Sequence, residues 1–342
     1  MAEQNADNKR KPTNKRNTKS TVNYKNAGKK TPQKSKGVKQ TQNKTVQKNN
    51  AQAQKTAGTQ QRTRKSGTGA SRTRTKTKPV RITPLGGLGE IGKNITLYEY
   101  GNDMFLVDCG MSFPDEETPG VDIVIPDFTY VLENKDKIRG LVLTHGHEDH
   151  IGAIPYLLKN FNVPIYGTRL TLGLVECKLN EHRLMSSAKL NVVKAGDIIR
   201  LGAFSVEFIH VNHSIPDSVG LAIRCPAGVI VQTGDFKIDT TPIDDKVIDI
   251  ARFAEIGKEG VLAYLADSTN AEQPGFTASE KIVGESFSNL FKKAGDHRII
   301  VATFSSNIHR IQQIIDEAVR CGRKVAVSGR SMVNVVNIAA QL

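Results

Sequence analysis

The densest group of side chains that could do chemistry lies within six residues. The segment His145-Gly-His147-Glu-Asp149-His150 supplies three imidazoles and the carboxylate of Asp149 as candidate metal ligands. Single histidines are more often surface or core residues, but this density favours metal binding. Imidazole combined with carboxylate suits zinc, with manganese and iron as competitors. The segment directly follows the apolar run 141–144, which predicts a strand that ends on the metal site.

Two further candidate ligands follow later predicted strands. His213 stands in Val-Asn-His-Ser after residues 204–210, and Asp235 stands in Thr-Gly-Asp-Phe after residues 229–233. Either residue alone would more often be structural, but its place after a strand and after the cluster favours a ligand role. We predict two ions: the first held by His145, His147 and His213, the second by Asp149 and His150, with Asp235 bridging both.

Two neighbouring metal ions fit hydrolytic chemistry. Ions about 3.5–4 Å apart hold a water, lower its pKa and neutralise charge on an oxyanion or a phosphorane. Asp149 would accept or steer the proton of that water. Groups behind the ligands orient imidazoles, and we expect Asp108 and Thr144 to serve in this way.

A glycine-rich segment precedes this cluster. Residues 87–92 match G-x-G-x-x-G and follow a predicted strand, but a dinucleotide site requires a helix next. Residues 93–100 are instead rich in strand-forming side chains. The pattern predicts a tight turn near the mouth of the active site.

The elements that must position these ligands are strands with short turns between them. This mixture of hairpins and one helical pattern predicts an α/β protein built as an αβ sandwich. The predicted strands are 80–83, 94–100, 104–108, 141–144, 192–193, 198–201, 204–210, 221–224 and 229–233, with a hairpin turn at 101–103 and helical spacing over 151–160.

A second region begins near residue 263. Predicted strands at 263–266, 298–303 and 324–328 alternate with predicted helices at 279–293 and 307–320, which favours a parallel βαβ layer. Ser279 is the expected N-cap of the first helix, and Gly322 the stop of the second. The sequence reaches Leu342 within an apolar helical pattern, which predicts a fragment of a longer product.

The first 78 residues differ in composition from the rest. They contain 22 Lys and Arg against two acids, whereas the remaining 264 residues carry a net charge of −6. With one aromatic residue, Tyr24, this segment lacks the apolar surface to offset its ordering entropy, so we expect disorder. Such basic segments bind nucleic acid without sequence preference or act as solubilising linkers, and the body of the chain favours nucleic acid.

Nothing in the sequence indicates export or membrane insertion. The chain lacks the apolar core of a signal peptide and any apolar stretch long enough to span a bilayer. The four cysteines, at 109, 177, 225 and 321, have no C-x-x-C spacing, so neither a structural zinc site nor a redox pair is indicated. We therefore expect a cytoplasmic protein.

The motifs together resemble the metallo-β-lactamase fold superfamily, in detail its bacterial β-CASP branch, the ribonuclease J family. The resemblance covers residues 79–342 and depends on several neighbouring segments as well as the metal motif. These are Gly86-Gly-Leu-Gly-Glu-Ile-Gly-Lys-Asn94, Val107-Asp-Cys-Gly-Met111, Leu143–Pro155, Asn212-His-Ser-Ile-Pro-Asp217, Thr233-Gly-Asp-Phe-Lys237 and Asp267-Ser-Thr-Asn270.

The resemblance implies an architecture and an activity. It implies a basic tail at 1–78, an αββα metallo-β-lactamase domain at 79–262 and the start of an inserted β-CASP domain at 263–342. It also implies 5′-to-3′ exonuclease and endonuclease action on RNA in processing and decay, with two zinc ions per chain and Asp267 as a catalytic acidic residue beside them.

Part of the β-CASP segment is expected to line the RNA cleft. The helix N-terminus near 307 would bind phosphate, or else Ser306 or Asn307 would simply cap it. The candidate substrate residues are Ser305, Ser306, His309, Ser328, Arg330 and Ser331.

The sequence departs from the family pattern in one respect. The family has two later histidines, a catalytic acid and the last ligand of the second ion, and neither lies in this sequence. A weakly active or RNA-binding fragment is therefore one alternative. Hydrolysis of a small ester, thioester or lactam on the same scaffold is another. The full-length family member would be a homo-oligomer.

Overall fold

The structure is a computed structural model that describes residues 78–116 and 118–341. The basic segment predicted to be disordered lies outside the described residues except for Lys78, so that prediction stays untested. The four cysteines are all free thiols.

The first sheet has six strands in sequence order. Its first three strands are antiparallel and its last four parallel, with β3 common to both halves. Tyr100 pairs with Asp103 across the hairpin, which confirms the turn predicted at 101–103. The strands are β1 (Arg81–Gly86), β2 (Ile95–Tyr100), β3 (Asp103–Val107), β4 (Ile138–Val142), β5 (Pro164–Gly167) and β6 (Lys189–Val192).

The second sheet has five strands in the order β11-β10-β9-β8-β7. Its strands pair antiparallel except for β10 with β11, which is parallel. They are β7 (Ile198–Leu201), β8 (Phe204–His210), β9 (Val219–Cys225), β10 (Gly228–Gln232) and β11 (Val261–Leu265).

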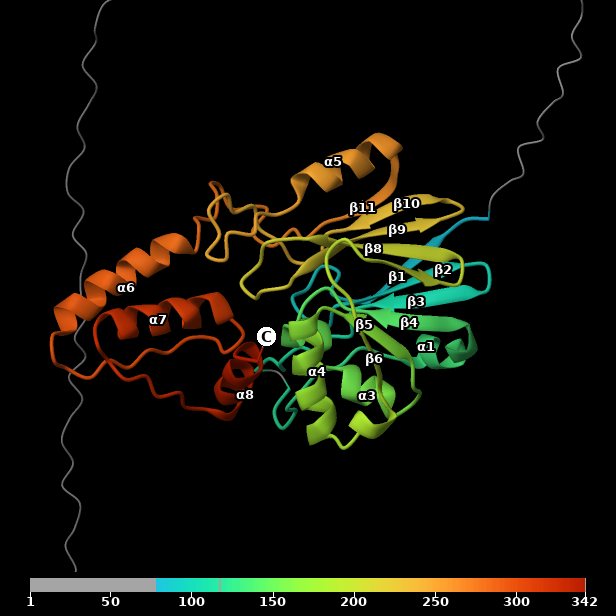
Figure 1. The fold of residues 1–342 in the computed structure, drawn as a ribbon. Coiled ribbons are helices and arrows are strands. Elements are labelled where there is room, and N and C mark those ends of the chain that lie inside the picture. The colour runs from blue at the N-terminus through green and yellow to red at the C-terminus, as the bar shows by residue number, and fades with distance from the viewer. Residues whose placement is uncertain (1–77, 117, 342) are drawn as a thin grey trace, which may run out of the picture. The chain divides into compact units, whose positions relative to one another are not determined.

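The two sheets pack face to face with helices outside both (Figure 1). Phe105 of β3 stacks on Tyr98 of β2 at 5.1 Å and meets Phe204 of β8 edge-on at 4.9 Å, which joins the sheets through aromatic contacts. On the outer face of the first sheet lie α3 (Ile154–Leu158) and α4 (Arg169–Glu181). On that of the second lies α5 (Ile250–Glu259). The predicted αββα fold is confirmed.

The helical pattern at 151–160 proves to be two short helices, α2 (Glu148–Ile151) and α3. Pro155, near the start of α3, has no N–H to continue a helix from the preceding turn, so it begins a new one. Helices α4 and α5 were not predicted from the sequence. The remaining short helices are α1 (Thr129–Glu133), η1 (Lys135–Lys137) and η2 (Met185–Ser187).

Helices dominate the second region. The predicted helices correspond to α6 (Lys281–Ala294) and α7 (Ile308–Arg320). Asn307 caps α7 by accepting a hydrogen bond from Arg310 N at 3.1 Å, and Gly322 follows the helix with a φ of 65°. The N-cap of α6 is Glu280 rather than the predicted Ser279.

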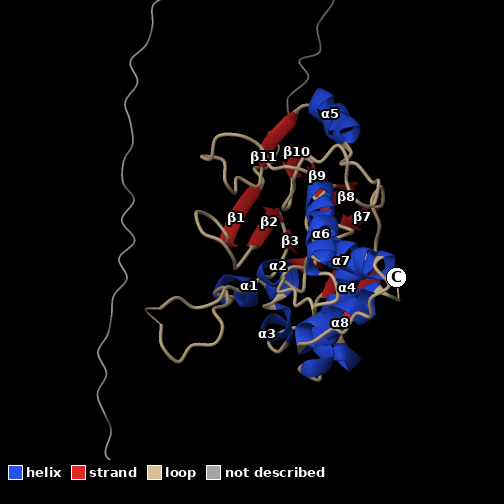
Figure 2. Cartoon of the chain, turned by 90° about the vertical axis from the view of Figure 1, so that its left-hand side faces the viewer, coloured by secondary structure: helices blue, strands red, loops and turns tan. Residues whose placement is uncertain are grey.

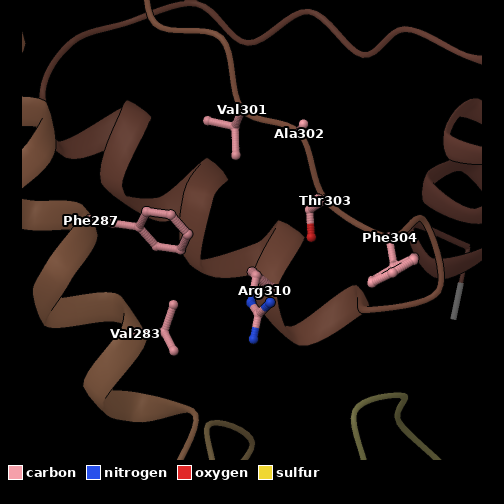
Figure 3. Close-up of a pocket in the computed structure, with 7 residues that line it drawn as sticks. All are labelled: Val283, Phe287, Val301, Ala302, Thr303, Phe304 and Arg310. Carbon is pink, nitrogen blue, oxygen red and sulfur yellow. The ribbon is translucent and has the colours of Figure 1, made fainter. Parts of the chain in front are cut away.

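The strands predicted at 298–303 and 324–328 are wrong, since both segments are irregular. A strand needs a neighbour to pair its backbone groups, and no described strand lies alongside either segment. Residues 301–304 instead border an apolar cavity of about 660 Å³ against α6 and α7, in which Phe287 and Phe304 face the space from opposite sides (Figure 3). The predicted parallel βαβ layer is therefore not formed among the described residues.

The last helix, α8 (Arg330–Ala339), packs against α4 (Figure 2). Val335 and Ile338 join the core beneath the first sheet, and Ile338 approaches Gly173 so closely that a β-carbon there would lie 2.8 Å from it. This contact connects the second region to the sandwich. Among the described residues, no helix is long and apolar enough to cross a membrane.

Candidate metal centre and substrate cleft

The predicted ligands gather where strands of both sheets end. His145 follows β4, His213 follows β8 and Asp235 follows β10. Since the two sheets face one another, their adjacent strand ends present these side chains to one space. The structure thus brings together all six residues that the sequence predicted as ligands.

The first group consists of three histidines and one aspartate. His147 Nδ1 lies 3.1 Å from both His145 Nε2 and His213 Nε2. Asp235 Oδ2 lies 3.9 Å from His145 Nε2 and 3.8 Å from His213 Nε2. These four potential ligand atoms are all within 4.8 Å of one another, a spacing that one ion can span.

The second group shares Asp235 with the first. His150 Nε2 lies 3.3 Å from Asp235 Oδ1 and 3.6 Å from Asp149 Oδ2. The two oxygens of Asp235 therefore face different groups, Oδ1 toward His150 and Oδ2 toward His145 and His213. This is the arrangement that a bridging carboxylate requires.

The protonation states of the first group suit a metal. Burial, followed by the neighbouring histidines, lowers the pKa of His145 well below its ordinary value. Burial likewise lowers the pKa of His213 to about 3 and also depresses the pKa of His147. All three imidazoles are neutral near pH 7 and offer lone pairs, which is the form that binds zinc. The residues present therefore fit such an ion.

His150 has a different electrostatic environment. Burial opposes its charged form, but the carboxylates of Asp108 and Asp235 outweigh burial and raise its pKa well above the ordinary value. Asp108 Oδ2 lies 2.8 Å from His150 Nδ1, which leaves Nε2 facing Asp149 and Asp235. A proton and an ion would compete for that nitrogen.

Asp108 and Thr144 orient the imidazoles as predicted. Thr144 donates twice to Asp108, from its backbone N–H and from Oγ1, each at 2.8 Å. Since the Thr144 hydroxyl proton is used there, its oxygen accepts from His145 Nδ1 at 3.0 Å. That contact fixes the proton of His145 on Nδ1 and turns Nε2 toward the proposed ion.

Two contributors were missed from the sequence. Residues 145–150 form the ligand loop. A β-carbon on Gly110 would lie 1.5 Å from Asp149 O in this loop, so only glycine allows the backbone after β3 to pass beneath it. The Asn94 side chain contacts both Asp149 and His150. Both residues lie within segments that carry the family resemblance, Gly86–Asn94 and Val107–Met111.

One cavity of about 690 Å³ opens on the second group. The turn at 87–92, Asp149, His150, Asp235 and Asp267 line it. The glycine-rich turn is followed by β2 rather than by a helix, so the strand predicted after the turn is confirmed. Asp267, just after β11, accepts hydrogen bonds from Thr269 N at 2.9 Å and Phe236 N at 3.4 Å.

A second cavity of about 710 Å³ opens on the other side of the ligand loop, at His147 and Asp149. It brings together two segments of the β-CASP region, since Ser305 Oγ lies 2.8 Å from Ser331 Oγ. Four of the six candidate substrate residues line it: Ser305, Ser306, Arg330 and Ser331.

The other two candidates lie elsewhere. Ser328 is exposed and does not line either cavity. His309 lies on α7 near Asp244 and Lys237, where burial lowers its pKa. The structure therefore does not bring these two residues to the cleft.

Comparison with known proteins agrees with both parts of the fold. Residues 88–252 match the family profile of the metallo-beta-lactamase superfamily, and residues 296–342 that of the ribonuclease J beta-CASP domain. The fold and site thus define a metallo-β-lactamase domain joined to the start of a β-CASP domain. In both parts the chain is similar to the ribonuclease J family.

Its curated relatives are considerably longer. The chain is 49% identical to Ribonuclease J of Synechocystis sp. over 78% of its own length and 42% of that protein. It is 49% identical to Ribonuclease J of Thermus thermophilus over 77% of its length and 47% of that protein. The chain therefore spans less than half the length of these relatives.

A solved structure supports the fold alone. A protein of unknown function from Enterococcus faecalis V583 aligns with a TM-score of 0.51 and 18% identity, over 69% of this chain and 62% of that one.

Proposed function

We propose that the chain provides the metal centre of a ribonuclease that hydrolyses RNA phosphodiester bonds with two zinc ions. The observation that carries this proposal is Asp235, whose two oxygens face two separate ligand groups. The relatives' name, Ribonuclease J, supports RNA as the substrate. Both 5′-to-3′ exonucleolytic and endonucleolytic cleavage, in RNA processing and decay, belong to the proposal.

The roles of the residues follow from the two groups. His145, His147 and His213 would hold the first ion, Asp149 and His150 the second, and Asp235 both. When bound, such ions make a water acidic enough to lose a proton near neutral pH and neutralise charge on phosphate. Asp149 would accept or steer that proton at its carboxylate. Asp267 would be a second catalytic carboxylate, since it lines the cavity that opens on Asp149 and Asp235.

The RNA backbone would pass through the cavity next to His147. Arg330 supplies a guanidinium that pairs with phosphate oxygens, and the hydroxyls of Ser305, Ser306 and Ser331 supply hydrogen bonds. His309 and Ser328 have no place in this part of the proposal, because neither lines the cavity.

The test is cleavage of a 5′-monophosphorylated, single-stranded RNA by the 342-residue chain. We expect cleavage that a chelator abolishes and added zinc restores. A lactam and a thioester serve as comparison substrates, because the same scaffold could hydrolyse them. Cleavage of either with RNA untouched would replace this function by small-molecule hydrolysis. RNA binding without cleavage at any metal concentration would leave a binding fragment.

The proposal extends to partners and location. The basic segment 1–78 would contact nucleic acid through its Lys and Arg side chains. The longer family members would form homo-oligomers in the cytoplasm.

A further inference from the structure

We propose that Asn94 is the positioning residue of the second ion site and holds Asp149 in its ligand orientation through its side-chain amide. The inference rests on the proposed function, because it concerns the ion that Asp149, His150 and Asp235 would share. Asn94 is not itself one of the ligands.

The backbone of Asn94 is fixed by contacts on both sides. Its N–H donates to Asp149 O at 3.0 Å, and its carbonyl accepts from Gly110 N at 2.9 Å. The residue therefore joins the end of the glycine-rich turn, the segment after β3 and the ligand loop. These contacts do not depend on the side chain, so a substitution at position 94 keeps them.

The side-chain amide faces acceptors. Asn94 Nδ2 lies 3.1 Å from Asp149 O and 3.3 Å from Asp149 Oδ2. A backbone carbonyl and an ionised carboxylate can only accept, so the amide nitrogen rather than its oxygen must face them. Among the described residues, this amide is the one hydrogen-bond donor to the Asp149 carboxylate.

The same nitrogen lies 3.1 Å from His150 Nε2, the atom that would bind the ion. Asp108 holds the opposite ring nitrogen, Nδ1, at 2.8 Å. The imidazole of His150 is thus fixed from one side by Asp108, whereas Asn94 lies beside its ligand atom and fixes the neighbouring carboxylate. The first group has no equivalent contact with Asn94, so the effect of this residue should be confined to the second ion.

The glycine-rich turn lies directly against the Asn94 side chain. A β-carbon on Gly87 would lie 2.4 Å from Asn94 Oδ1, so the turn covers the amide only because position 87 is glycine. Asn94 and the turn both line the cavity that opens on Asp149 and Asp235. The glycine-rich turn would thus serve the metal centre by covering Asn94.

The test measures zinc binding to the whole chain by calorimetry and by metal analysis after dialysis, for the wild type, Asn94→Ala and Asn160→Ala. Asn160 is exposed and its amide contacts only Tyr156 O, so it is the matched control. We expect two ions in the wild type and the control. In Asn94→Ala we expect the first ion at unchanged affinity and the second bound about 10- to 100-fold more weakly.

Any other result would overturn the inference about Asn94. Two ions of unchanged affinity in Asn94→Ala would overturn the inference and leave the proposed function intact. Loss of both ions would show a general effect on the fold and would also overturn it. A wild type that takes up only one ion at saturating zinc would refute the two-ion function, and the inference with it. The first ion, retained in Asn94→Ala, shows that the variant is folded.

Discussion

The two regions of this chain differ in how completely their cores bury apolar side chains. In the metallo-β-lactamase region, both sheets bury aromatic and aliphatic side chains completely, for example Leu141 of the first sheet and Phe208 of the second. In the β-CASP region, the central cluster contains only Phe287, Phe291 and Ala318, while Ile300 and Phe304 are 88% and 83% exposed. All six candidate ligands lie in the first region. A metal centre needs rigid support, and only this region provides it within the described residues.

The largest expected effect concerns the residue that both ligand groups share. Asp235→Ala removes an oxygen from each group, so we expect cleavage of RNA to fall by at least about 1,000-fold. Ion content should fall below two per chain. The control is Asp296→Ala, an exposed residue of the second region. Cleavage within tenfold of the wild type in Asp235→Ala would remove the basis of the proposed function.

Two matched Phe→Ala substitutions compare how tightly the two cores are packed. Phe105→Ala leaves a hole between the sheets, and we expect a loss of about 3–5 kcal/mol in the free energy of unfolding. Phe287→Ala should cost only about 1–2 kcal/mol, because Phe287 already borders an open cavity (Figure 3). Denaturant unfolding followed by circular dichroism measures both. Equal losses would show that the second core is as well packed as the first.

A buried ion network on the outer face of the second sheet gives a pH-dependent test. Hydrogen bonds from Arg252, together with those from Arg224, lower the pKa of Glu207 despite its burial. A carboxyl group with a lowered folded-state pKa adds stability above its unfolded pKa, and this is lost as the pH falls through the folded value. We expect Glu207→Gln to cost about 1–3 kcal/mol at pH 7 and to destabilise progressively less as the pH falls below about 4.

The control for Glu207 is Glu259→Gln. Glu259 also pairs with Arg224, but its side chain is 41% exposed, so the loss should stay below about 1 kcal/mol. Thermal and denaturant unfolding between pH 3 and 7 measures both variants. A loss in Glu207→Gln that is the same at every pH would contradict the assigned ion pairs.

The smallest expected effect concerns the basic segment. Removing residues 1–78 should weaken RNA binding by about tenfold at low salt and flatten its salt dependence, because fewer counterions are released. Titrations of labelled RNA at several salt concentrations measure both quantities. An unchanged salt slope would show that the two folded regions alone bind RNA.

Much of the site follows from local sequence. Strand-forming runs before His145, His213 and Asp235 led to the predicted grouping of the six candidate ligands, and the structure brings the same residues together in two groups. The αββα fold followed from the resemblance to the family. The role of these residues as ligands and the boundary between residues 262 and 263 stay predictions.

Contacts between distant segments could not be derived in this way. The helices α4 and α5 were not predicted, although Ile250, Phe253 and Ile256 of α5 recur at helical spacing. The segments 298–303 and 324–328 have strand-like sequences, but a strand forms only where a partner is present. The conformation of an apolar extended segment is thus decided by its neighbours.

The sequence by itself determined which side chains could bind metal, because residue type and spacing fix that chemistry. Only the tertiary structure decided how those side chains are held. Asp108 orients His150, Asn94 holds Asp149, and Gly110 allows the backbone to pass beneath the ligand loop. These contacts join segments about 40 to 55 residues apart in the sequence. Hydrogen bonds and steric fit act over a few ångströms in space, whatever the separation along the chain.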